Sequence, residues 1–191
     1  MDRGSQGGDA LLRVWRAVAA RYPSYDLVLP GENSFICCAA TCNAWCCRAL
    51  SVPLGDADVQ RMEGASGLAP ARFLECEDGE PIALPLADPY LLARRDGACA
   101  LLEAGGTCSQ YAGRPAACRL YPYQVAWLDG KTGNPSGRDR AGAIALLLRH
   151  RECPGFTGPR LSEEGQAGLL AEMLRLQSGA ESTRDWSERE T

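Results

Sequence analysis

Cysteine is the residue type in this chain whose number and grouping point to specific chemistry. The 191 residues include ten cysteines, most of them in two groups. The first group is Cys37, Cys38, Cys42, Cys46 and Cys47, and the second is Cys99, Cys108 and Cys118. Cys76 lies alone between the groups, and Cys153 lies alone after them. Thiolates are soft ligands that suit zinc and iron–sulfur clusters, so the grouping predicts a thiolate metal site.

The spacing of these cysteines differs from that of a zinc ribbon, in which paired C-x-x-C motifs hold one ion. Cys46 and Cys47 are adjacent, and in an extended backbone adjacent side chains point to opposite faces. Two such thiolates would serve separate metal sites or two corners of a larger cluster. The pattern therefore favours an iron–sulfur cluster, expected as 4Fe-4S, with zinc as the alternative.

Other roles for cysteine apply to particular positions. A buried cysteine can pack as a small apolar side chain, and we expect this of Cys76. Cys37 and Cys38 compete for one ligand position, and the Phe-x-Cys register favours Cys37. A disulfide framework would require an oxidising compartment, which the N-terminal sequence does not support.

His150 is the only histidine, three residues before Cys153. A His/Cys pair at this spacing could bind a metal ion, but a histidine on the surface or supporting the site is the expected role. With one histidine, a hydrolytic triad has little support.

Composition excludes several classes of function. The chain is 46% hydrophobic and 23% charged, as in ordinary globular proteins. Its formal net charge of -4 argues against a nucleic-acid-binding face. We find no apolar run long enough for a membrane span and no signal peptide at the N-terminus. A cytoplasmic location, where thiols stay reduced, is therefore predicted.

Periodicity and punctuation predict a small, irregular, cysteine-rich α+β domain organised around metal, with flanking helices. Asp9 is expected to cap a helix over residues 10–21, and Ser162 to open a final helix reaching Gln177. Asp56 or Asp58 could cap a helical turn. Short strands are expected over 49–54, 73–76 and 121–128, with strand or helix over 141–149, and an Asp78-Gly79 turn. Residues 1–8 form a predicted flexible tail, 9–178 a single metal-binding domain, and 179–191 a frayed tail.

Over residues 35–155 the chain resembles the CxxCxxCC-type cysteine-cluster family, a zinc- or iron-chelating domain related to the cysteine domain of flagellin lysine-N-methylases. The most specific matching string is R-P-A-A-C-R-L-Y-P at 114–122. The other matching strings are F-I-C at 35–37, the cysteines at 42, 46 and 47, D-G-A-C-A-L-L at 96–102, C-S-Q-Y at 108–111 and C-P-G at 153–155. One departure is the longer gap between the first cysteine and Cys42, which contains Cys38.

The resemblance implies eight metal ligands and a zinc or iron–sulfur site. These ligands are Cys37, Cys42, Cys46, Cys47, Cys99, Cys108, Cys118 and Cys153. Among the matching residues, Arg114 and Arg119 could donate hydrogen bonds to carbonyls or cluster sulfurs and raise a cluster's reduction potential. Surface salt bridges are the alternative role for both arginines.

The leading functional hypothesis is an iron–sulfur protein with a redox or accessory role. A zinc-stabilised interaction module is one alternative. A protein lysine methylase using S-adenosylmethionine is another, although no glycine-rich loop follows a clear strand. The expected partner is a redox protein or a protein substrate, not nucleic acid or membrane. Whether the chain is an enzyme stays open.

Overall fold

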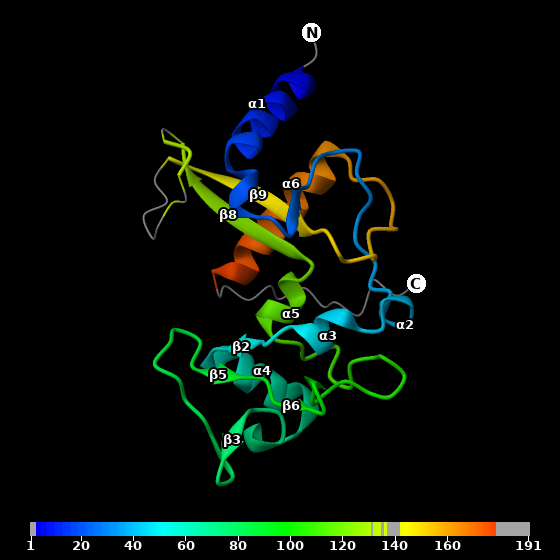
Figure 1. Ribbon diagram of the computed structural model, residues 1–191, viewed down its shortest axis with the longest axis vertical. Helices are drawn as coiled ribbons and strands as arrows, with labels where there is room; N and C mark the ends of the chain where they lie inside the picture. The colour runs from blue at the N-terminus through cyan, green and yellow to red at the C-terminus, as the bar shows by residue number, and fades with distance from the viewer. Residues whose placement is uncertain (1–2, 131, 135, 137–141, 179–191) are drawn as a thin grey trace. The chain divides into compact units, whose positions relative to one another are not determined.

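The computed structural model describes residues 3–130, 132–134, 136 and 142–178 of an α+β chain (Figure 1). The chain divides into two compact units. Of the described residues, unit 1 contains those up to Cys37 and those from Leu120 to Ser178, while unit 2 contains Cys38–Arg119. The predicted α+β class is confirmed. The predicted domain of residues 9–178 spans both units, and the predicted tail after residue 178 lies outside the described residues.

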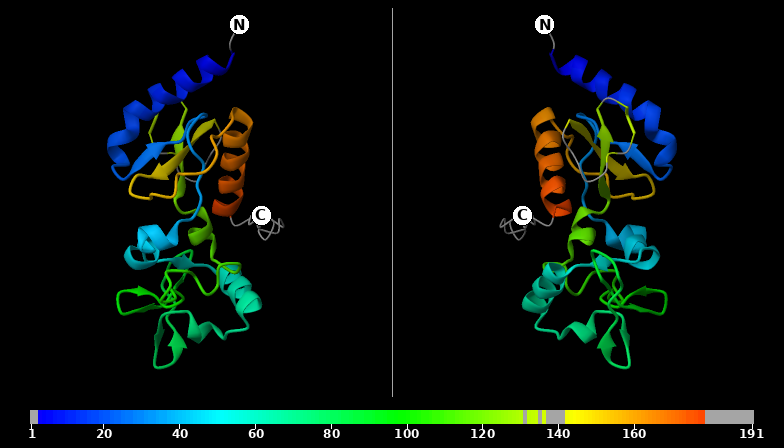
Figure 2. Two further views of the ribbon diagram at one scale, coloured as in Figure 1. Left: turned by 90° about the vertical axis from the view of Figure 1, so that its right-hand side faces the viewer. Right: turned by 90° about the vertical axis from the view of Figure 1, so that its left-hand side faces the viewer.

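Unit 1 is a three-stranded antiparallel sheet with a helix on each face, as Figure 2 shows. Its elements are α1 (Arg3–Val18), η1 (Ala19–Arg21), β1 (Tyr25–Leu27), β8 (Tyr123–Asp129), β9 (Ala143–His150) and α6 (Glu163–Gln177). The strand order is β1-β9-β8. Alternate residues of β9 serve opposite faces, since Leu146 and Leu148 pack with Trp15 of α1 while Leu147 packs with Met173 of α6.

The ends of unit 1 match the sequence predictions in part. Ser162 caps α6 as predicted, its hydroxyl accepting a hydrogen bond of 3.0 Å from the backbone N–H of Gly165. The first helix begins at Arg3, so Asp9 lies inside the helix and the predicted cap is wrong. For residues 141–149 the sequence predicted either a strand or a helix. The structure has a strand here, β9, whose residues 143–149 pair with β8.

Unit 2 is built from short helices and two-stranded sheets. Its elements are α2 (Ala39–Cys42), α3 (Trp45–Ala49), β2 (Pro53–Leu54), α4 (Asp56–Ser66), η2 (Pro70–Arg72), β3 (Cys76–Glu77), β4 (Glu80–Pro81), β5 (Tyr90–Leu91), β6 (Arg94–Arg95), β7 (Ala98–Cys99) and α5 (Ala116–Leu120). The pairs are β2 with β5, β3 with β4, and β6 with β7. The buried apolar core of unit 2 consists of Leu54, Met62, Phe73, Leu74, Leu92 and Leu101.

The strand predictions in unit 2 are largely too long. Residue 49 ends the helix α3, and only Pro53–Leu54 of the predicted strand 49–54 is extended and paired. Leu74 makes a single bridge to Leu92 before β3 begins. The predicted turn is confirmed, because Asp78 and Gly79 join β3 to β4 with positive φ angles of 53° and 88°.

Within the described part of the chain, no helix combines the length and the apolar character needed to cross a bilayer.

Candidate metal centre

Cys46 and Cys47 lie in α3, a short helix. Their Sγ atoms are 4.0 Å apart. The expectation that these thiols point to opposite faces is wrong, because it assumed an extended backbone, whereas successive helical residues are rotated by only about 100°. Two thiolates on one tetrahedral zinc ion lie about 3.8 Å apart when each Zn–S bond is about 2.3 Å. The pair can therefore bind one metal ion together.

Cys99 comes from the hairpin of β6 and β7, where it is the register partner of Arg94. The hairpin turns tightly at Asp96 and Gly97, whose φ angles are 50° and 76°. Cys99 and Cys108 both pack against the apolar core of unit 2. The core thus fixes two thiols that are separated in sequence.

Cys118 lies in α5, and α4 holds the beginning of that helix. The backbone N–H of Ala116 donates a 2.9 Å hydrogen bond to the Oδ1 atom of Asp58, which also forms an ion pair with Arg61. A Cβ atom on Gly113 would lie 2.7 Å from the Cβ of Ala65, so only glycine allows α4 to approach this closely. Asp56 or Asp58 was predicted to cap the helix that is α4, but Gly55 is the residue at its N-cap and makes no side-chain cap hydrogen bond, while Asp58 caps α5.

Thiols from these three segments influence one another electrostatically. Cys47 is affected by Cys46, Cys99 and Cys108, and Cys118 is affected by Cys46, Cys99 and Cys108. Five of the predicted ligands are therefore neighbours within unit 2: Cys46, Cys47, Cys99, Cys108 and Cys118. No group of three or more His, Cys, Asp or Glu side chains in the described ranges is placed to hold a metal ion. The five thiols are therefore neighbours, but they do not form a complete metal-coordination shell.

In the Cys46–Cys47 pair, the favoured protonation state has one thiolate and one thiol. The hydrogen bond from Cys47 lowers the pKa of Cys46 to about 6. The hydrogen bond to Cys46, followed by burial, raises the pKa of Cys47. One ligand of the pair is thus already deprotonated near neutral pH, the form in which cysteine binds metal.

The pKa values of Cys99, Cys108 and Cys118 are shifted upward, so these three thiols resist ionisation without a cation. Burial raises the pKa of Cys99 and of Cys108, and burial followed by the charges of Cys99 and Cys108 raises that of Cys118 to about 12. A bound metal ion reverses this preference, since a coordinating thiol is deprotonated outright. The chemistry of this donor set therefore fits a thiophilic metal or cluster.

Arg114 is close enough to three of these thiols, Cys46, Cys108 and Cys118, to influence them electrostatically. Its positive charge adds to the effect of Cys47 in lowering the pKa of Cys46, and it partly opposes the rise that burial causes in the pKa of Cys108 and Cys118. The guanidinium group is held over the Tyr111 ring, 3.5 Å from its centroid, and Nε donates a 3.0 Å hydrogen bond to the Tyr111 carbonyl. Arg119 lies next to Cys118 in α5 and is partly buried.

Cys38 and Cys42 lie at the two ends of the short helix α2. The carbonyl of Cys38 accepts hydrogen bonds from the backbone N–H groups of Thr41 and Cys42, at 2.8 and 3.1 Å. Both cysteines belong to unit 2.

Cys37 and Cys153 lie in unit 1 on two segments that run side by side. The backbone N–H of Ile36 donates a 2.7 Å hydrogen bond to the carbonyl of Gly155. A Cβ atom on Gly155 would lie only 2.6 Å from the carbonyl oxygen of Ile36 and equally close to the ring of Phe35. Glycine thus permits the contact that brings the Cys37 and Cys153 segments together.

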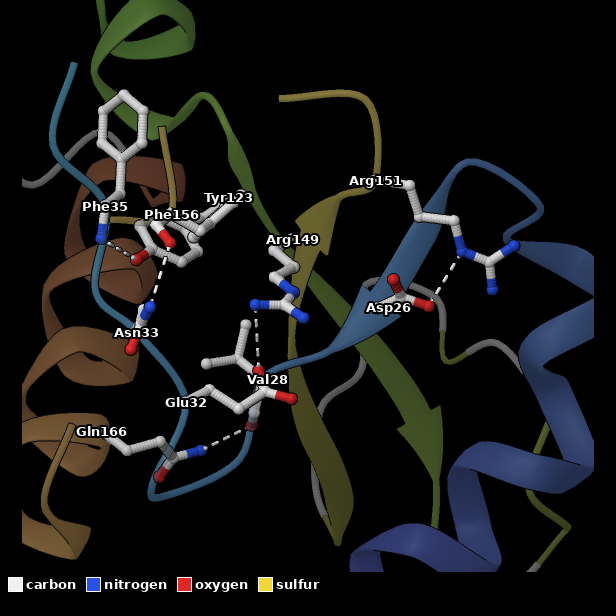
Figure 3. Close-up of polar contacts among 10 residues, drawn as sticks. All are labelled: Asp26, Val28, Glu32, Asn33, Phe35, Tyr123, Arg149, Arg151, Phe156 and Gln166. Atoms are coloured by element: carbon white, nitrogen blue, oxygen red, sulfur yellow. Dashed lines mark hydrogen bonds and ion pairs between the residues drawn. The ribbon is translucent and has the colours of Figure 1, made fainter. Parts of the chain in front are cut away.

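Aromatic packing anchors the segment that leads to Cys37 (Figure 3). The backbone N–H of Phe35 donates a 3.2 Å hydrogen bond to the hydroxyl of Tyr123. The Phe35 ring contacts the rings of Phe156 and Tyr123, with centroids 5.9 and 6.3 Å away. The position of the backbone before Cys37 is therefore set by the core of unit 1.

Two residues outside the predicted ligand set have distinct environments. The Cys76 thiol, in the β3–β4 hairpin, donates to the carbonyl of Leu74 at 3.4 Å. His150 is buried, so a surface location for it is wrong, and its ring contacts Tyr25 and Tyr121 at centroid distances of 5.2 and 5.7 Å.

An α+β chain in which one unit gathers partly buried thiols defines a protein of the thiolate metal-binding class. Residues 37–141, more than half of the chain, match the family CxxCxxCC, "Putative zinc- or iron-chelating domain". The chain belongs to this family, as the sequence resemblance indicated, and membership supports zinc or iron binding. Cys153 lies beyond the matched residues. Comparisons with curated proteins and with solved structures found no match.

Proposed function

We propose that the chain is an iron–sulfur protein with a redox or accessory role. The observation that carries this proposal is the neighbourhood of five thiols in unit 2: Cys46, Cys47, Cys99, Cys108 and Cys118. A single tetrahedral zinc ion uses four ligands, so this set offers one thiol more than one zinc needs. Thiolate ligands also suit iron–sulfur clusters.

Charge compensation supports a redox role for the site. Several thiolates around a metal carry net negative charge, and a nearby cation offsets part of it. Arg114 supplies that cation beside Cys46, Cys108 and Cys118. Because the potential of a cluster depends on net charge, burial and hydrogen bonds to its sulfurs, Arg114 is positioned to raise the potential.

Cys42, Cys37 and Cys153 complete the eight proposed ligands. Cys42 belongs to unit 2, whereas Cys37 and Cys153 share the paired segments of unit 1. In this proposal, the thiolates are kept reduced by a cytoplasmic environment. The proposed partner is a redox protein that exchanges electrons with the cluster.

The decisive experiment is anaerobic purification of the full chain with quantification of iron, zinc and acid-labile sulfide. We expect a coloured protein with iron and sulfide in similar amounts. The variant Cys47→Ser should lose most of both, while Cys76→Ser, which alters a thiol of the β3–β4 hairpin, should retain them. A colourless protein containing stoichiometric zinc would contradict the proposal.

A zinc-stabilised interaction module is the second candidate, favoured by the 4.0 Å separation of the Cys46 and Cys47 sulfurs. That separation is close to the distance of about 3.8 Å between two thiolates on one tetrahedral zinc ion. Here the metal would hold unit 2 together without redox chemistry. Zinc without sulfide, together with unfolding of the protein by a chelator, would identify this function.

A further inference from the structure

Arg94 joins the two elements that carry the Cys46–Cys47 pair and Cys99. From β6, its NH1 group donates a 2.6 Å hydrogen bond to the carbonyl of Leu50. Its NH2 group donates to the carbonyl of Arg48, and also to that of Gly97 at 2.6 Å. One guanidinium group therefore binds both the end of α3 and the turn of the β6–β7 hairpin.

The carbonyl groups of Arg48 and Leu50 need hydrogen-bond donors that α3 itself cannot supply. The last carbonyls of a helix have no intrahelical donor, and α3 spans only Trp45–Ala49. The planar guanidinium fork can donate in several directions at once, and its charge suits a helix C-terminus. A lysine ammonium group would supply the charge but not this fork.

The backbone of Arg94 is fixed independently of its side chain. Arg94 is the register partner of Cys99, and its N–H donates a 2.8 Å hydrogen bond to Oε1 of Glu75. Two residues before Arg94, the N–H of Leu92 donates to the carbonyl of Val52 at 2.9 Å. The guanidinium group therefore extends from a fixed point opposite one proposed ligand to the helix that carries two others.

We propose that Arg94 is a positioning residue that sets the placement of the Cys46–Cys47 pair relative to Cys99 for metal binding. This inference rests on the proposed metal-binding function and adds a residue to which sequence analysis assigned no role. Groups that orient metal ligands typically contribute 10- to 100-fold to metal affinity. Arg94 acts in this way through α3 and does not itself contact the metal.

The test compares Arg94→Gln with Arg95→Gln in the full, metal-free, reduced chain. Arg95 is the next residue of β6, and its side chain is exposed. Each protein is titrated anaerobically with Co²⁺ alone, and thiolate-to-cobalt absorption reports affinity and the number of bound thiolates. We expect Arg94→Gln to bind about 10- to 100-fold more weakly with an altered spectrum. Arg95→Gln should match the wild type. Equal affinity and spectra for both variants would overturn the proposal.

Arg94→Lys keeps the proposal testable if Arg94→Gln does not fold. It retains the charge at the end of α3 but cannot reproduce the fork. We expect its circular dichroism to be that of the wild type and its cobalt spectrum to be altered; wild-type cobalt binding would overturn the inference. If the wild-type chain binds no Co²⁺, the inference also fails. The proposed iron–sulfur function is judged separately, from iron and sulfide in the purified protein.

Discussion

The sulfur atoms of Cys46 and Cys47 lie 4.0 Å apart in α3, and their hydrogen bond divides the protonation of the pair unequally. Cys46 has a pKa of about 6, while the pKa of Cys47 is raised. The metal-free protein therefore presents one thiolate at neutral pH among thiols that burial keeps protonated. The Cys46 thiolate is the form in which cysteine reacts as a nucleophile and binds metal.

We therefore expect Cys46 to be the first thiol of the pair to react with iodoacetamide in the metal-free protein. Its alkylation rate should rise through pH 6, because only the thiolate reacts. Cys118, with a pKa of about 12, should stay unreactive at neutral pH. In Cys47→Ala the hydrogen bond is lost, so the midpoint for Cys46 should move toward alkaline pH. Mass-spectrometric peptide mapping measures each rate; an unchanged midpoint would contradict this assignment.

Serine substitutions should distinguish the cysteines that bind the metal from Cys76, which lies outside the group of five neighbouring thiols. Cys118 is influenced by Cys99 and Cys108, whereas Cys76 donates to the carbonyl of Leu74. Cys118→Ser should reduce bound metal to less than half of the wild-type amount, because a hydroxyl is a poor ligand for soft metals. Cys76→Ser should keep the wild-type amount. Elemental analysis of the purified proteins measures both, and equal metal loss in the two would contradict the ligand assignment.

Local patterns in the sequence predicted those parts of the fold that depend on nearby residues. Ser162 caps α6 through a bond to Gly165, three residues away, and Asp78-Gly79 forms the expected turn. The helical conformation of the backbone around Cys46 could not be predicted from nearby residues. Its helix is stabilised by Arg94, which is 46 residues from Arg48 in sequence, and no local pattern encodes that contact.

The difference between local and long-range contacts also explains why the roles of Asp58 and Arg94 could not be predicted from the sequence. The cysteine types and groups predicted the thiol-rich site directly, and the R-P-A-A-C string placed Arg114 near it. Asp58 was predicted only as a local cap, because its partner Ala116 is 58 residues away. Arg94 was assigned no role, because the direction of its side chain is decided by tertiary packing.

Asp58 should be necessary for the stability of unit 2. It is buried, and it accepts hydrogen bonds from Arg61 and from the backbone of Ala116. Asp58→Ala leaves both donors without this acceptor, so we expect the free energy of unfolding to fall by about 1–3 kcal/mol. Asp56→Ala, at an exposed position in the same helix, should change it by less than about 0.5 kcal/mol. Urea unfolding of the metal-free proteins measures the difference; equal effects would contradict the capping role.

Gly155 should tolerate no side chain. A Cβ atom there would lie 2.6 Å from both the Ile36 carbonyl oxygen and the Phe35 ring, so the paired segments must separate. We expect Gly155→Ala to destabilise the protein by about 1–3 kcal/mol, the usual cost of overpacking. Gly168→Ala is the matched control, because its Cβ would meet no atom within 4 Å inside α6. That substitution should stabilise by about 0.5–1 kcal/mol. Thermal unfolding distinguishes the two, and a neutral Gly155→Ala would show that the segments separate readily.

Tyr123 should make the stability of unit 1 depend on alkaline pH. Burial raises the pKa of its phenol to about 12 from the ordinary value of 10.0. A group whose pKa is raised on folding stabilises the protein below its unfolded pKa, and this stabilisation is lost as pH rises through the folded pKa. The loss therefore occurs between pH 10 and pH 12, and by pH 11 it reaches about 1.4 kcal/mol.

The variant Tyr123→Phe isolates this effect. At pH 8 it should be less stable than the wild type by about 1–3 kcal/mol, because the partly buried N–H of Phe35 loses its acceptor. The wild type alone loses the phenol contribution as pH rises, so the gap should narrow by about 1.4 kcal/mol at pH 11. Urea unfolding at both pH values measures the gap, and parallel stability curves would show that the Tyr123 phenol ionises as readily in the folded protein as in the unfolded chain.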